Sequence, residues 1–115
     1  MTEHMITTVD ALYSVYKQPA ERAVQKEIPK LDTHCRHFIA LSPFLVLSTD
    51  GGDGTADASP RGDAPGFVTV LDDNTLALPD RPGNNRLDSL INILRNPAVG
   101  MIFLVPGINE TLRIN

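Results

Sequence analysis

Short apolar runs that follow one another from residue 44 onward are the feature that most constrains how this chain can fold. The runs are rich in Val, Ile, Leu and Phe and are bounded by Gly, Pro, Asp or Asn, which favour turns. They lie at 44–49, 67–71, 75–78, 99–105 and 111–115, with a further short candidate at 58–61. The pattern predicts strands joined by loops, with a β-hairpin over 67–78.

Helical spacing of apolar residues is found mainly before the first of these runs. It predicts a helix over 8–17 with Thr8 as its N-cap, a short helical stretch from 19 to about 29, and a helix from about 32 to 41. One more amphipathic helix is predicted at 86–94, between two of the strands. Its apolar face is expected to lie in the core and consists of Leu87, Leu90, Ile91 and Leu94.

The order of these elements indicates the fold class. Helices come first and mostly strands follow, with one helix inserted, which predicts an α+β fold whose antiparallel sheet curls toward a barrel. A length of 115 residues corresponds to one domain. The alternating segment 111–115 reads as a strand, so we expect further strands to be missing at the C-terminus.

Composition excludes several classes of protein. The chain has 10 Lys and Arg against 14 Asp and Glu and contains no Trp, which argues against a nucleic-acid platform. No apolar run reaches the roughly 18 residues of a membrane span, and the N-terminus lacks a signal-peptide pattern. The single cysteine cannot form an internal disulfide, so the sequence favours a cytoplasmic protein.

The arginines suggest a phosphate site. No Lys occurs after residue 30, whereas six Arg do. A guanidinium can contact phosphate with two parallel hydrogen bonds. Two turn-rich segments, SPRGD at 59–63 and DRPGNNR at 80–86, carry the candidate ligands, which are Ser59, Arg61, Arg81, Asn84, Asn85 and Arg86. The start of a helix after the second segment could also hold an anion. The alternative is that Asp80 and Asp88 pair with these arginines at the surface.

The same segments resemble a known family. Residues 57–67, 78–90 and 92–100, followed by the strands after them, are similar to the pyridoxamine 5'-phosphate oxidase-like family of FMN-binding split barrels. The similarity covers about 38–115 and rests on SPRGD followed by DRPGNNR. It implies an N-terminal helical segment over 1–37 and an incomplete split-barrel domain over 38–115.

The resemblance also implies a function. Such proteins are usually homodimers that hold FMN at the subunit interface, so we expect the strand with Ser59 and Arg61 to face the flavin. Arg81, Asn84, Asn85 and Arg86 are expected near the flavin phosphate. The implied function is an FMN-dependent oxidoreductase acting on a small molecule, with the hydride chemistry carried by the flavin. The alternatives are a non-catalytic or structural remnant of the barrel, or a protein that binds a deazaflavin or haem.

Three other patterns are weaker. His34, Cys35 and His37 have residue types that bind metals, but neighbouring positions on a helix point to different faces. A Ser–His–Asp hydrolase is disfavoured because no G-x-S-x-G turn is present. The segment 50–55 resembles the start of a calcium loop without the acidic residue at its twelfth position, and a hairpin loop is the preferred interpretation.

Overall fold

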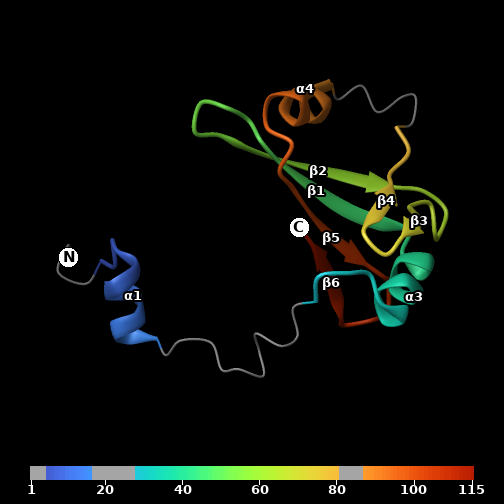
Figure 1. Ribbon diagram of the computed structural model, residues 1–115, viewed down its shortest axis with the longest axis horizontal. Coiled ribbons are helices and arrows are strands. Elements are labelled where there is room, and N and C mark those ends of the chain that lie inside the picture. The colour runs from blue at the N-terminus through green and yellow to red at the C-terminus, as the bar shows by residue number, and fades with distance from the viewer. Residues whose placement is uncertain (1–4, 17–27, 81–86) are drawn as a thin grey trace.

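The computed structural model describes residues 5–16, 28–80 and 87–115. Three helices and six strands occur in this part of the chain (Figure 1). In order they are α1 (Val9–Val15), α3 (Thr33–Leu41), β1 (Phe44–Asp50), β2 (Ala56–Gly62), β3 (Thr69–Asp72), β4 (Thr75–Ala77), α4 (Leu87–Arg95), β5 (Val99–Leu104) and β6 (Thr111–Ile114). These elements lie where the apolar runs and the helical spacing predict them.

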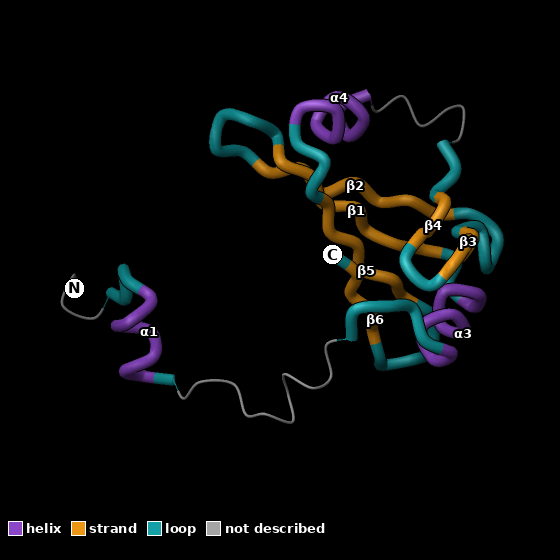
Figure 2. The backbone as a smooth tube through the Cα atoms, in the orientation of Figure 1, coloured by secondary structure: helices purple, strands orange, loops and turns teal. Residues whose placement is uncertain are grey.

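The strands form two antiparallel sheets, which confirms the α+β class with a split-barrel type of fold. Four strands pair in the order β2-β1-β5-β6, and β3 and β4 form a separate hairpin. Figure 2 shows this hairpin and the two helices α3 and α4 beside the larger sheet. The described strands do not close into a barrel, since β2 and β6 each keep one edge without a partner strand among the described residues.

The larger sheet has one covered face and one open face. Along β1, Leu45, Leu47 and Thr49 are buried, whereas Ser48 between them is exposed. The alternation places the core on the side of α3 and the hairpin. The residues of this core are Phe38, Ile39, Leu45, Leu47, Val68 and Phe103. The prediction of β1 as a strand is confirmed, but only one of its faces is fully buried.

Helix α3 begins where the sequence predicts it, and the Asp32 side chain caps its N-terminus. The Asp32 carboxylate accepts a hydrogen bond from the backbone N–H of Cys35 at 2.8 Å, and this bond holds the pKa of Asp32 below its ordinary value. The helix then turns Cys35, Phe38 and Ile39 toward the sheet. Burial raises the pKa of the Cys35 thiol, which stays neutral in the core.

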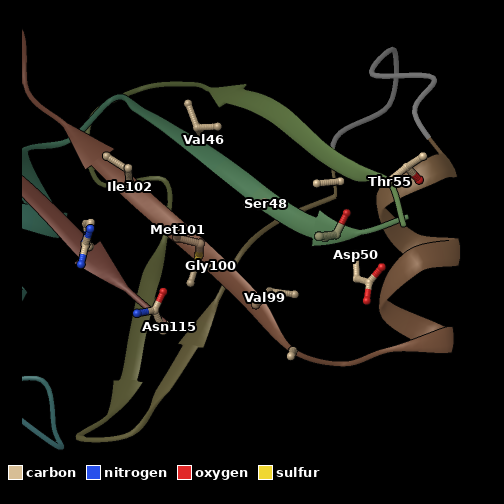
Figure 3. A pocket seen from close by; sticks show the side chains of 13 residues that line it. Val46, Ser48, Asp50, Thr55, Val99, Gly100, Met101, Ile102 and Asn115 are labelled. Carbon is tan, nitrogen blue, oxygen red and sulfur yellow. The ribbon is translucent and has the colours of Figure 1, made fainter. Parts of the chain in front are cut away.

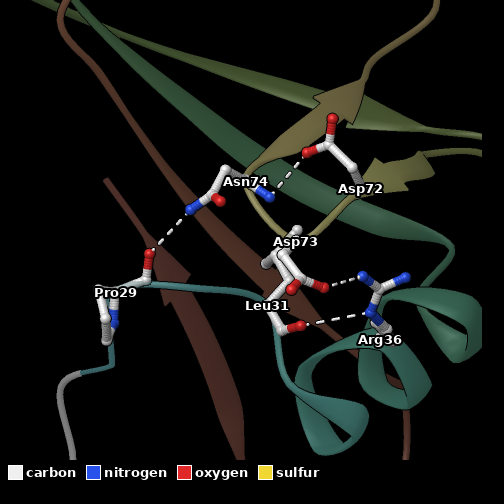
Figure 4. A network of polar contacts seen from close by, with 6 residues as sticks. All are labelled: Pro29, Leu31, Arg36, Asp72, Asp73 and Asn74. Atoms are coloured by element: carbon white, nitrogen blue, oxygen red, sulfur yellow. Dashed lines mark hydrogen bonds and ion pairs between the residues drawn. The ribbon is translucent and has the colours of Figure 1, made fainter.

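Polar contacts attach the β3–β4 turn to the segment before α3 (Figure 4). Arg36 donates from a terminal nitrogen to the Asp73 carboxylate at 2.6 Å and from Nε to the carbonyl of Leu31 at 3.2 Å. The backbone N–H of Leu31 in turn donates to the carbonyl of Asp73 at 2.7 Å. Asn74 adds a bond to the carbonyl of Pro29. The hairpin is therefore fixed to α3 at its turn as well as through the core.

Helix α1 has the predicted cap, because the Thr8 hydroxyl accepts a hydrogen bond from the N–H of Ala11 at 3.0 Å. None of its residues is buried. The helical stretch predicted from 19 to about 29 lies almost entirely outside the described residues.

The expectation for the apolar face of α4 is wrong. Leu87 and Leu94 are 66% and 87% exposed, and Leu90 and Ile91 are also exposed. The buried residues of this helix are instead Ser89 and Asn92. Polar partners on the sheet explain the inversion, since the end of β1 and the start of β2 present hydroxyl and carboxylate groups to the helix.

Candidate functional site

Strand β2 places Ser59 and Arg61 on the covered face of the sheet. The two residues are 5% and 9% exposed, while Pro60 between them is exposed. Their partners across the strand pair are Leu47 and Leu45, both core residues. Alternation along β2 therefore turns two polar side chains toward the apolar core.

Only one nitrogen of the Arg61 guanidinium forms a hydrogen bond with a described residue. Its Nε donates a hydrogen bond to Oγ of Ser59 at 3.1 Å. Its terminal nitrogens form no ion pair or hydrogen bond with another described residue. Because no buried side-chain nitrogen or oxygen in the described part lacks a partner, these terminal nitrogens reach the surface. A largely buried arginine without a carboxylate has the donor geometry for an anion such as phosphate.

Access to this arginine is possible from the edge of the sheet. Strand β2 is an outer strand in the order β2-β1-β5-β6. A group that approaches its unpaired edge can reach side chains on the covered face without passing through the core. The other predicted ligands, Arg81, Asn84, Asn85 and Arg86, lie outside the described residues.

Helix α4, which follows those ligands in the chain, crosses from β2 toward β1. The hydroxyl of Ser89, near the start of the helix, donates to the carboxylate of Asp57 at 3.4 Å. Farther along, Nδ2 of Asn92 donates to Oγ1 of Thr49 at 3.0 Å. The helix thus begins on the side of β2, the strand that carries Ser59 and Arg61 (Figure 1).

An open groove of about 670 Å³ lies on the other face of the sheet. Figure 3 shows Val46 and Ser48 of β1 opposite Gly100 and Ile102 of β5. Arg113 of β6 also lines it and is the strand partner of Ile102. Ser59 and Arg61 do not line this groove, since their side chains lie on the covered face.

The sequence did not single out these groove residues. Ser48, within an otherwise apolar run, is the signal that the second face of β1 is not a core face. The sequence also does not predict that Ser89 and Asn92 contact the sheet, because the helical spacing favours an orientation with the leucines inward. A polar pair three residues apart within an amphipathic helix is the pattern that could have revealed them.

The weaker patterns do not assemble into sites. Cys35 faces the core, whereas His34 and His37 are exposed and His34 lies 3.7 Å from the Glu110 carboxylate. No group of three or more His, Cys, Asp or Glu in the described ranges could hold a metal ion. The segment predicted as a hairpin loop does join β1 to β2, and Gly52 adopts a φ of 94° there, which favours glycine.

A comparison with family models gives one match that covers most of the chain. The family described as pyridoxamine 5'-phosphate oxidase matches residues 31–115. The chain belongs to the pyridoxamine 5'-phosphate oxidase family. The match begins just before α3 and includes all six described strands and α4. No curated protein and no solved structure matches the chain.

Membership in the pyridoxamine 5'-phosphate oxidase family indicates a flavin-binding, oxidoreductase-like protein. All six predicted ligands, from Ser59 to Arg86, lie within the matched range. None of the described helices is long and apolar enough to cross a membrane.

Proposed function

We propose that this chain binds FMN and serves as an oxidoreductase on a small molecule. The observation that carries the proposal is Arg61. The residue as a whole is 9% exposed, its Nε is bonded to Ser59, and its terminal nitrogens pair with no carboxylate of the described residues. Terminal nitrogens that reach the surface and bind no described residue can donate charge-assisted hydrogen bonds to acceptor atoms of a ligand. The flavin ring carries carbonyl and nitrogen acceptors of this kind, and membership in the family indicates a flavin-binding protein.

The proposed roles divide the ligands into two groups. Ser59 and Arg61 orient the flavin from β2 by hydrogen bonds. Arg81 and Arg86, with Asn84 and Asn85, hold its phosphate by charge and by amide donors. Bound flavin supplies the hydride chemistry. The protein contributes binding and orientation, within the split-barrel unit at 38–115 of a cytoplasmic homodimer whose flavin site lies at the subunit interface.

The first test is whether the purified full-length protein carries flavin. We expect a yellow protein with the visible flavin bands, and released FMN in its mass spectrum. A colourless protein that does not quench the fluorescence of added FMN would contradict the proposal. If the mass spectrum shows a deazaflavin or haem in place of FMN, the protein binds that alternative cofactor.

The second test asks which face of the sheet holds the flavin. Arg61→Lys keeps the charge but removes the planar fork, so we expect FMN affinity to fall about tenfold or more. Arg113→Lys is the matched control, because Arg113 lines the groove on the opposite face. If FMN affinity is equal in wild type and Arg61→Lys but falls in Arg113→Lys, the flavin binds in the groove on the opposite face and not beside Arg61.

A further inference from the structure

Helix α4 carries its apolar stripe on the outside of the described structure. Leu87, Leu90, Ile91 and Leu94 follow the spacing i, i+3, i+4, i+7 and are all exposed. An amphipathic helix normally turns such a stripe toward a core. Here hydrogen bonds from Ser89 and Asn92 to the sheet fix the opposite orientation. The helix cannot turn its leucines inward without breaking those bonds, so the stripe is available to a partner.

Two charged residues flank the stripe on one side. Asp88 lies in the first turn of α4 and Arg95 in the last. They are seven residues apart, which puts them on the same side of the helix two turns from each other. Both are exposed, and neither forms an ion pair with a described residue.

We infer that α4 packs in antiparallel fashion against α4 of a second copy of this chain. A two-fold axis between the helices would bring the two stripes together and place Asp88 of each copy opposite Arg95 of the other. The contact is self-complementary in charge, which a heterologous partner would not need. A pairing of this kind extends the proposed homodimer by naming the helix that forms it.

Helix α1 is the competing occupant within the same chain, since Val9, Leu12, Tyr13 and Tyr16 are also exposed. Its first turn carries Asp10, and its last turn carries no basic residue. It would therefore meet Arg95 with an acidic residue but leave Asp88 unpaired. The reciprocal charges on α4 favour the second copy.

Sedimentation equilibrium of the full chain provides the first test. We expect a dimer whose dissociation constant rises about a hundredfold or more in Leu94→Glu, because each of the two copies then brings a carboxylate into the apolar contact. Leu71→Glu is the matched control: Leu71 is 61% exposed on β3, which belongs to the separate hairpin and not to the sheet that α4 contacts, so the dimer should persist. A monomeric wild type, as α1 covering the stripe would give, or a dimer that is unaffected by Leu94→Glu, would overturn the inference.

Charge reversal identifies the partner helix. D88R and R95D should each weaken the dimer about tenfold, because two attractive contacts become repulsive. Mixing the two variant chains should restore association, since every contact in the mixed dimer again joins opposite charges. The D88R/R95D double variant should also recover. If neither the mixture nor the double variant recovers, α4 does not pair with itself.

This inference and the flavin proposal fail separately. A yellow dimer that is unaffected by Leu94→Glu would overturn the helix contact and leave the flavin proposal in place. A colourless dimer that responds to Leu94→Glu would do the reverse.

Discussion

The Nδ2 group of Asn92 on α4 donates a hydrogen bond to Oγ1 of Thr49 on β1 at 3.0 Å, and both side chains are buried. Together with the bond from Ser89 to Asp57, it attaches the helix to the sheet through polar groups. Buried polar groups are costly unless they are paired, so these bonds fix one orientation of the helix. Ser89, in the first turn of the helix, is thereby held beside β2.

Removal of one partner in this pair should destabilise the protein. Asn92→Leu leaves the Thr49 hydroxyl buried without its partner, and we expect the free energy of unfolding to fall by about 1–3 kcal/mol. Thr49→Val should cost a similar amount, and the double variant should cost less than the sum of the two. Urea unfolding measures all three. Additive costs would show that the bond itself contributes nothing.

Asn96→Ala is the control for that series. Its Nδ2 donates to the carboxylate of Asp50 at 3.0 Å and its Oδ1 accepts from the N–H of Ala98, but both contacts are exposed. Water can replace an exposed partner, so we expect a cost below about 1 kcal/mol.

Most of the fold could be predicted from local pattern. Short apolar runs bounded by Gly, Pro and Asp predict the strands, and the Thr8 side chain predicts the cap of α1. The Asp32 cap of α3 is a finding of the structure. The orientation of α4 could not be predicted in this way. Hydrophobic spacing identifies the apolar face of a helix but not what covers it, and the polar contacts of Ser89 and Asn92 depend on residues more than thirty positions away.

The candidate site could be predicted only in part. Residue chemistry and family resemblance selected Ser59 and Arg61, and the structure places both on one face of β2 within hydrogen-bond distance. Strand pairing determines that these two side chains face the core and that the groove opens on the other side of the sheet. Pairing is non-local, so alternation in one strand does not say which face will be covered.

Arg86 tests the phosphate half of the proposed site. Arg86→Ala should weaken FMN binding by about 1.5–3 kcal/mol if the guanidinium makes a charge-assisted bond to the phosphate. Riboflavin, which lacks the phosphate, should lose little affinity in the same variant. Fluorescence titration with both ligands measures the difference. Lys30→Ala, which removes an exposed cation outside the proposed site, should change neither affinity. An unchanged FMN affinity in Arg86→Ala would favour the surface ion-pair interpretation.

The Arg36 contacts allow a charge effect to be separated from a backbone effect. Asp73→Asn removes only the ion pair, which is substantially exposed on both sides, so we expect a cost of roughly 0–1 kcal/mol that shrinks with added salt. Arg36→Ala also removes the bond to the carbonyl of Leu31 and should cost more. Unfolding in urea at low and high salt tests both. Equal costs would mean that the bond to Leu31 adds nothing.

Acid should destabilise the fold through three capping and turn aspartates. Each accepts a backbone N–H that holds its pKa below the ordinary 3.8, Asp32 from Cys35, Asp50 from Gly52 and Asp72 from Asn74. A lowered pKa in the folded state gives stability that is present above the unfolded pKa and is lost as the pH falls through the folded pKa. We therefore expect the free energy of unfolding to decline below about pH 4.

Asp32→Asn isolates one of these contributions. An amide oxygen still accepts the N–H of Cys35 but does not titrate, so α3 keeps its cap. Urea unfolding across the acidic range should give a flatter pH profile for this variant than for wild type. Asp32→Ala should instead be less stable than wild type at neutral pH, because the N–H of Cys35 loses its acceptor. A profile for Asp32→Asn as steep as that of wild type would show that the cap does not contribute to acid sensitivity.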